Sequence, residues 1–262
     1  MRLFFQTIAI ITLLTSCSGD STTEQDRSEQ SVTGDVTSNL PIPDNRFKDS
    51  YQVLIFGNSH IINIGSLIET MIKADNPDAQ TQVVNQGGGF LDDNTTRSRR
   101  LSRIEGRQWS HIILQGQKYS QSGIVEYPTR SAERWIGIAK EHGIMPVLFP
   151  EHPRRGNTEE GQRVHEIHTG IAARQKSCVA PIGLAWDRAL SIQPGLALHA
   201  SDGNHASALG RVLTAYVFYE VITGQPADLL PIIESLNVSA DLQQLFKQVA
   251  SETISANEPC GF

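Results

Sequence analysis

Short apolar segments alternate with longer segments of helical periodicity over most of this 262-residue chain. The length of the apolar segments and their polar or glycine-rich boundaries are typical of buried strands. The predicted strands are residues 51–56, 80–85, 111–114, 144–149 and 178–182. The predicted helices are residues 59–74, 94–106, 129–142, 158–176, 184–190 and 205–223, with two more expected within 228–256. Because strands joined by helices of this length form crossover connections, the pattern predicts an α/β fold with a mainly parallel sheet.

The N-terminal residues 1–16 are predicted to be a signal peptide. Arg2 is followed by an apolar run that ends at Leu14. This run is shorter than the roughly 20 apolar residues that a membrane-spanning helix needs, and it is typical of a secretory signal. Residues 14–17 read Leu-Thr-Ser-Cys and resemble the lipobox of bacterial lipoproteins, in which the cysteine is acylated. We therefore expect a lipid anchor on Cys17 and a place in the bacterial cell envelope, the alternative being an ordinary secretory signal.

Residues 17–45 are rich in Ser, Thr, Asp, Glu and Gln and contain few large apolar side chains. Such a segment buries too little apolar surface to offset the entropy lost on ordering. The sequence therefore predicts a flexible tether over residues 17–45 and one folded domain over residues 46–262.

The charge balance argues against a nucleic-acid partner. The formal net charge is −6, and no run of basic residues suggests nucleic acid. A protein that binds a phosphate backbone needs a basic surface. We therefore expect a small-molecule or carbohydrate substrate and a membrane contact through Cys17, while the oligomeric state stays open.

No cofactor or metal ion is expected. The cysteines have no metal-ligand spacing, and His165 and His168 lie one helical turn apart without the His-Glu-x-x-His pattern of a zinc site. We expect these two histidines on a solvated helix face. Besides Cys17, the chain has two cysteines, Cys178 and Cys260, and the expected compartment is oxidising. They either form a disulfide or remain as two free thiols, and the sequence leaves both alternatives open.

Polar or glycine residues follow four of the predicted strands. They occupy positions 58–59, 85–89, 115–117 and 150–152. In an open parallel sheet, ligands bind outside the carboxyl ends of the strands, so these positions are expected along one edge. Ser59 comes directly after the first strand and opens a helix, where backbone N–H groups stabilise negative charge. Ser59 is therefore a candidate nucleophile, the alternative being a helix cap.

Asp202 and His205 precede the helix predicted over residues 205–223. Their three-residue offset lets the carboxylate reach one imidazole nitrogen and leaves the other for a serine hydroxyl. With Ser59, they predict a catalytic triad in which His205 is the general base and Asp202 orients it. Taken alone, Asp202 is also compatible with a turn or an N-cap.

Two further segments are candidates for binding an oxyanion. The Gly-Gly-Gly sequence at residues 87–89 lets a backbone N–H approach a substrate oxygen closely. Gln115 and Gln117 follow the third strand, where a side-chain amide is able to donate a hydrogen bond to the same oxygen.

Together these segments resemble the SGNH (GDSL-type) hydrolase superfamily over roughly residues 50–225. Residues 57–60 read Gly-Asn-Ser-His, where the family has Gly-Asp-Ser, and Asp202 and His205 match its Asp-x-x-His block. The Gln-Gly-Gln at residues 115–117 resembles the Gln-Gly-Glu of carbohydrate acetylesterases more than the usual Gly-x-Asn-Asp.

The resemblance implies a three-layer, flavodoxin-like α/β/α sandwich with a five-stranded sheet. It also implies an oxyanion hole made by the backbone N–H groups of Ser59 and Gly89 and by the amide of Gln115. Gly88 and Gln117 remain alternatives for the last two.

The expected function is hydrolysis of esters, with short acyl groups such as acetyl on carbohydrate, through an acyl-Ser59 intermediate. A lipase, a thioesterase or an O-acyltransferase uses the same triad. A carbohydrate-binding protein without catalytic activity is the alternative from another class, and in that case Ser59 and His205 should not meet.

Overall fold

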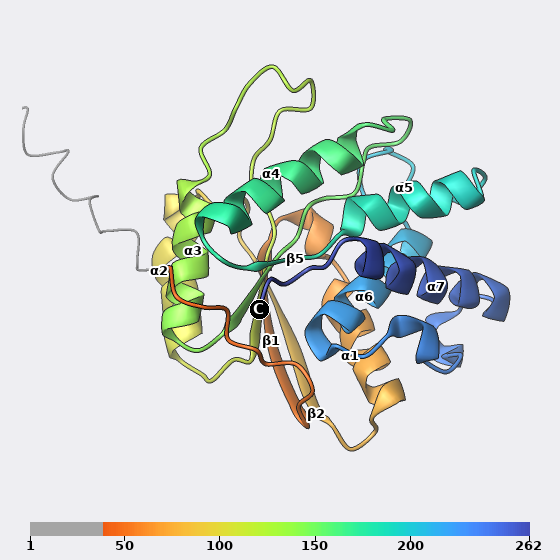
Figure 1. Ribbon diagram of the computed structural model, residues 1–262, viewed down its shortest axis with the longest axis horizontal. Helices are drawn as coiled ribbons and strands as arrows, with labels where there is room; N and C mark the ends of the chain where they lie inside the picture. The colour runs from red at the N-terminus through yellow and green to blue at the C-terminus, as the bar shows by residue number, and fades with distance from the viewer. Residues whose placement is uncertain (1–38) are drawn as a thin grey trace, which may run out of the picture. The chain divides into compact units, whose positions relative to one another are not determined.

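The computed structural model of the chain describes residues 39–262 (Figure 1). The predicted signal peptide, the predicted lipid attachment site at Cys17 and most of the predicted tether lie outside the described residues. Among the helices of residues 39–262, none combines the length and the apolar character needed to cross a bilayer.

A five-stranded sheet lies at the centre of the domain. The strands are β1 (Ser50–Gly57), β2 (Gln80–Gly87), β3 (His111–Leu114), β4 (Met145–Leu148) and β5 (Cys178–Val179). They lie in the order β2-β1-β3-β4-β5, and every neighbouring pair is parallel. This is the doubly wound order of flavodoxin-like folds. The predicted parallel α/β sheet is therefore confirmed.

Helices cover both faces of the sheet. Successive side chains of β1 point to opposite faces, so Val53 and Ile55 belong to one buried cluster, and Leu54 and Phe56 to another. The first cluster is covered by α1 (Ile64–Asp75), α5 (Ile182–Ile192), α6 (Ala208–Thr223) and α7 (Ala240–Ala256). The second is covered by α2 (Arg97–Glu105), α3 (Arg130–Glu141) and α4 (Glu160–Arg174). The result is the expected three-layer sandwich (Figure 1).

The helix predicted to begin at Ser59 is divided in two. A 3₁₀ turn spans Ser59–Ile61, and α1 begins only at Ile64. The side chain of Asn58 accepts a hydrogen bond from the backbone N–H of His60 and so caps the short turn. Asn63 then adopts a left-handed conformation with φ of 62°, which ends the turn before the long helix starts.

The helix predicted from residue 205 begins later, at Ala208. The hydroxyl of Ser207 accepts a hydrogen bond from the backbone N–H of Gly210 at 3.2 Å and caps α6. His205 consequently lies in the loop before the helix. Of the two helices expected within residues 228–256, only α7 is an α-helix, and two 3₁₀ turns precede it.

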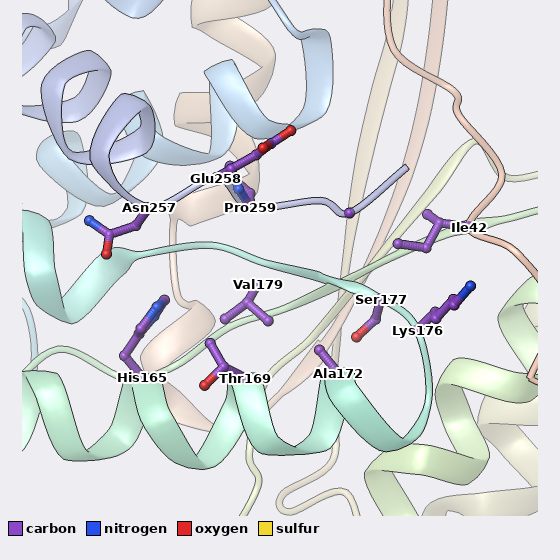
Figure 2. A pocket seen from close by; sticks show the side chains of 11 residues that line it. Ile42, His165, Thr169, Ala172, Lys176, Ser177, Val179, Asn257, Glu258 and Pro259 are labelled. Carbon is purple, nitrogen blue, oxygen red and sulfur yellow. The ribbon is translucent and has the colours of Figure 1, made fainter.

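Residues 39–45 belong to the folded domain, which corrects the predicted boundary of the tether. The Asn39 side chain accepts a hydrogen bond from Lys140 Nζ at 3.0 Å. The amide of Asn45 donates to two backbone carbonyls at 2.8 and 2.9 Å. Ile42 is buried and lines a pocket beside α4 (Figure 2). These few contacts anchor residues 39–45, which directly follow the polar stretch on which the predicted tether was based.

The prediction that His165 and His168 face solvent is also wrong. Both side chains are buried, and Figure 2 shows His165 lining a pocket together with the C-terminal residues 257–259. Burial lowers the pKa of both histidines, that of His168 to about 4. They are therefore neutral packing groups at neutral pH.

A disulfide joins Cys178 to Cys260 and settles the question that the sequence left open. Cys178 lies in β5, and the adjacent backbone N–H of Val179 donates to the carbonyl of Pro259 at 2.8 Å. The bridge and this hydrogen bond hold the C-terminal segment against the edge of the sheet.

Replacing both bridge cysteines by alanine should lower the free energy of unfolding. The two cysteines are 82 residues apart in sequence, so the open chain gains considerable entropy in the unfolded state. We expect a loss of roughly 2–4 kcal/mol, measured by urea unfolding under non-reducing conditions. Adding reductant to the wild type should reproduce the loss but leave the double variant unchanged. Equal stability of both proteins without reductant would argue against the bridge.

Candidate active site

Ser59, His205 and Asp202 form a continuous hydrogen-bonded relay. Ser59 Oγ lies 2.7 Å from His205 Nε2, and His205 Nδ1 lies 2.5 Å from Asp202 Oδ2. Ser59 follows β1 directly, and the other two residues lie in the loop before α6. The structure thus brings together the three residues that the sequence predicted as a triad.

The loop that carries Asp202 and His205 is organised by Asp202 itself. Its Oδ1 accepts hydrogen bonds from the backbone N–H groups of Asn204 at 2.9 Å and His205 at 3.0 Å. The hydrogen bond from the His205 side chain lowers the pKa of Asp202 most, and the two backbone bonds add to the effect, so this pKa lies far below its usual range. Asp202 is therefore a carboxylate at neutral pH. Its role as a cap of α6, which the sequence left possible, belongs instead to Ser207.

The loop after β4 supports the loop of the triad. The backbone N–H of Arg155 donates to the carbonyl of Gly203 at 2.9 Å. The guanidinium of Arg155 donates to the carbonyl of Ala200 at 2.5 Å. These contacts hold the loop that carries His205 in place.

Gln115 does not have the geometry expected of an oxyanion donor, which corrects that prediction. Its side chain is fully buried, its Oε1 accepts from the backbone N–H of Asn58 at 2.7 Å, and its Nε2 donates to Glu151 Oε1 at 2.5 Å. A Cβ atom on Gly57 would collide with this amide, so glycine is required there. Gln115 consequently holds the turn of Ser59 in place instead of facing the substrate.

Gln117, the alternative donor, lines the pocket beside Ser59 but has its amide engaged. Its Nε2 donates to the carbonyls of Lys118 at 2.9 Å and Pro128 at 3.2 Å. An amide nitrogen has two hydrogens, so both are used within the loop between β3 and α3.

The backbone leaves N–H donors for an oxyanion at Ser59 and in the glycine turn. Within residues 39–262, the N–H groups of Ser59, Gly88 and Gly89 donate no hydrogen bond to another protein group. Gly88 and Gly89 have φ of 144° and 82°, a region that favours glycine. The N–H groups of Ser59 and Gly89 thus remain candidates for the oxyanion hole, with Gly88 still the alternative to Gly89.

Glu151 is a site residue to which sequence reasoning gave no role. It follows β4 and lines the same pocket as Ser59. Its Oε2 lies 3.5 Å from the hydroxyl of Tyr119 and 3.7 Å from His60 Nε2. Burial raises the pKa of Glu151 to about 7. Its position at the carboxyl end of a strand, among residues 150–152, was the signal that pointed to it.

Aromatic rings pack behind the base. His60 stacks on His205 with ring centroids 4.9 Å apart, and His152 packs against His60 at 5.3 Å. His152 in turn stacks on the buried Trp186 at 3.9 Å. Burial lowers the pKa of His60 to about 4, with the charge of His205 acting in the same direction, and that of His152 to about 3. These neutral rings restrict how His205 turns.

The pocket beside the triad has a volume of about 640 Å³. Polar and aromatic side chains line the pocket, and none of its lining residues within 39–262 is aliphatic. Besides the residues already named, the lining includes Phe90, Lys118, Gln121, Tyr127 and Asn204. Within residues 39–262, no group of three or more His, Cys, Asp or Glu side chains is arranged to hold a metal ion.

Glu151→Gln should change how stability depends on pH. The folded protein holds a proton on Glu151 up to about pH 7, whereas the unfolded chain releases it near pH 4.5. The contribution of Glu151 to the free energy of unfolding therefore falls as pH rises between these values. Relative to the wild type, the glutamine variant should gain stability over this window and show a constant difference outside it, as measured by urea unfolding.

The histidines near Glu151 act in the opposite direction, but equally in both proteins, so the comparison isolates the carboxyl group. Glu126→Gln, at an exposed position, is the matched control and should show no such trend. Parallel stability curves for the wild type and the Glu151 variant would contradict a buried, protonated Glu151.

Solved structures share this architecture, although no protein-family model and no curated protein matches the sequence. A DUF4886 family protein from Bacteroides uniformis is 14% identical, with a TM-score of 0.63, over 81% of this chain and 97% of that one. A candidate SGNH hydrolase from Slackia heliotrinireducens is 22% identical, with a TM-score of 0.51, over 65% and 98%.

An acetyl-xylooligosaccharide esterase from Geobacillus stearothermophilus is 15% identical, with a TM-score of 0.52, over 66% of this chain and 94% of that one. At these identities the likeness concerns the fold. The sheet order, the two helical layers and these neighbours lead to one conclusion: the chain has the fold of the SGNH hydrolases.

Proposed function

We propose that this chain is a serine hydrolase of the SGNH superfamily that cleaves ester bonds through an acyl-Ser59 intermediate. The observation that carries the proposal is the relay from Asp202 through His205 to Ser59, with distances of 2.5 and 2.7 Å. A hydroxyl, an imidazole and a carboxylate in this order are the parts that acyl transfer requires.

The mechanism follows from the orientation of the three groups. His205 Nε2 takes the proton of Ser59 Oγ while this oxygen attacks the acyl carbon. The negative charge that develops on the carbonyl oxygen is held by the N–H groups of Ser59 and Gly89. His205 then gives the proton to the leaving alcohol, and water attacks the acyl-Ser59 ester by the reverse path. Asp202 stabilises the imidazolium form of His205 throughout.

A binding protein without catalytic activity is disfavoured by the same distance. Its distinguishing expectation is that Ser59 and His205 do not meet, whereas their side chains lie within hydrogen-bond reach. If Ser59 were only a helix cap or part of a turn, it would need no imidazole beside it. A binding site alone would need no carboxylate hydrogen-bonded to that imidazole.

The proposed substrate is a carbohydrate that carries short acyl groups such as acetyl. Three aromatic side chains, Phe90, Tyr119 and Tyr127, lie in the pocket beside polar groups, which suits a ligand with both apolar faces and hydroxyls. The lack of aliphatic lining among the described residues disfavours a long acyl chain. The acetyl-xylooligosaccharide esterase among the structural neighbours is consistent with this choice.

We also propose that the enzyme is anchored in the bacterial cell envelope through a lipid on Cys17. The proposal rests on the lipobox-like residues 14–17 and the apolar run before them. The disulfide between Cys178 and Cys260 is consistent with an oxidising compartment outside the cytoplasm.

Ser59→Ala should abolish turnover of p-nitrophenyl acetate. Loss of a nucleophile of this kind lowers kcat on the order of 10⁶-fold. Ser66→Ala, on the exposed side of α1, is the matched control and should leave kcat unchanged. Hydrolysis that persists in the Ser59 variant would assign the nucleophile to another residue.

The length of the acyl chain should decide the rate. Across p-nitrophenyl esters from acetate to dodecanoate, kcat/KM should fall by at least roughly tenfold, because the pocket offers a long acyl chain no aliphatic side chains to pack against. Acetylated oligosaccharides should compete with the acetate ester. A kcat/KM that rises with chain length would favour a lipase or thioesterase. Transfer of acetyl to an added sugar, detected by mass spectrometry, would favour an O-acyltransferase.

A further inference from the structure

Arg100 differs from the other arginines of α2. The helix is rich in arginine, and most of its side chains are exposed or half-buried, but Arg100 has no exposed surface. It points from the helix toward the sheet, where its guanidinium lies over the rings of Phe56 at 5.1 Å and Trp135 at 5.9 Å. The charged end of the side chain therefore lies against aromatic rings of the second apolar cluster.

The guanidinium of Arg100 binds two successive backbone carbonyls. Nη2 donates to Gly89 O at 3.3 Å, and Nη1 donates to Phe90 O at 3.1 Å. These carbonyls follow directly after the N–H of Gly89, the candidate oxyanion donor. The planar guanidinium has its donors in a fixed geometry, so it fixes both peptide groups at once.

Within residues 39–262, Arg100 forms no ion pair with a carboxylate. The charge of Asp93 raises the pKa of Arg100, but burial lowers it by more. A buried charge without a counter-ion is costly, and an apolar side chain of similar volume would fill the space at less cost. A requirement to hold the carbonyls of Gly89 and Phe90 in one orientation would explain why the fold tolerates the cost of burying Arg100.

The turn that Arg100 holds borders the triad. In the register of β1 and β2, Gly57 pairs with Gly87, so Ser59 and Gly89 each lie two residues beyond a paired position. Phe90 lines the same pocket as Ser59 and His205. The glycines of the turn have wide conformational freedom, so the turn needs an external contact to become rigid.

We propose that Arg100 is a positioning residue of the active site. By binding the carbonyls of Gly89 and Phe90, it orients the Gly89 N–H toward the oxyanion that forms at Ser59. Its positive charge also lies beside the turn at which negative charge develops. This inference rests on the proposed esterase function.

Arg100→Met and Arg100→Lys test the proposal in the full-length protein with p-nitrophenyl acetate. Methionine fills the volume but removes the charge and both hydrogen bonds, so kcat should fall by roughly 10–100-fold while KM changes by less than about twofold. Lysine keeps the charge but cannot bind both carbonyls with a planar fork, so it should restore part of the lost kcat.

Arg103→Met is the matched control on the same helix. Arg103 donates to Gln86 Oε1 at 3.0 Å and does not contact the turn. This variant should keep the kcat of the wild type. The melting temperature of each protein is measured on the same samples, so that loss of fold is separated from loss of catalysis.

A folded Arg100→Met protein with the kcat of the wild type would overturn the proposal, as would an effect confined to KM. If the methionine variant does not fold, the lysine variant decides, and an unchanged kcat in folded Arg100→Lys would also overturn it. Ser59→Ala, assayed in parallel, separates the two hypotheses. Activity in that variant refutes the esterase mechanism, whereas its loss together with a fully active Arg100→Met refutes the role of Arg100 alone.

Discussion

The hydrogen bond between Ser59 Oγ and His205 Nε2 joins two loops that are 146 residues apart in sequence. The parallel sheet makes it possible, because β1 and the loop before α6 meet at the carboxyl edge of the strands. The short 3₁₀ turn that begins at Ser59 and the late start of α6 keep both side chains out of α-helices. Each is therefore free to point toward the other.

Buried polar groups fix the turns around this hydrogen bond. Gln115 binds the backbone of the Ser59 turn, Glu151 binds Gln115, and Arg100 binds the glycine turn after β2. Each lies in an environment where an unpaired polar group is costly, so each strongly prefers one arrangement. Groups behind the candidate active site, and not only those within it, are therefore hydrogen-bonded and hold its turns in place.

The correct and the incorrect sequence predictions have different physical origins. Asp202 and His205 lie in one short loop, so their spacing alone brings carboxylate and imidazole together. Gln115 was placed at the right edge of the sheet, but its direction depends on Glu151, which comes from another strand. His165 was expected in solvent because a helical pattern does not reveal that a distant segment, here residues 257–259, lines one pocket with it.

The sequence by itself determined most of the elements, the parallel sheet and the spacing that joins Asp202 to His205, because periodicity, turn residues and short spacings are local properties of the chain. Only the tertiary structure decided which polar side chains face the pocket and which are bound behind it. It also decided that Cys178 meets Cys260 and that residues 39–45 join the domain. These outcomes depend on hydrogen bonds and packing between segments far apart in sequence, and no local pattern encodes such pairings.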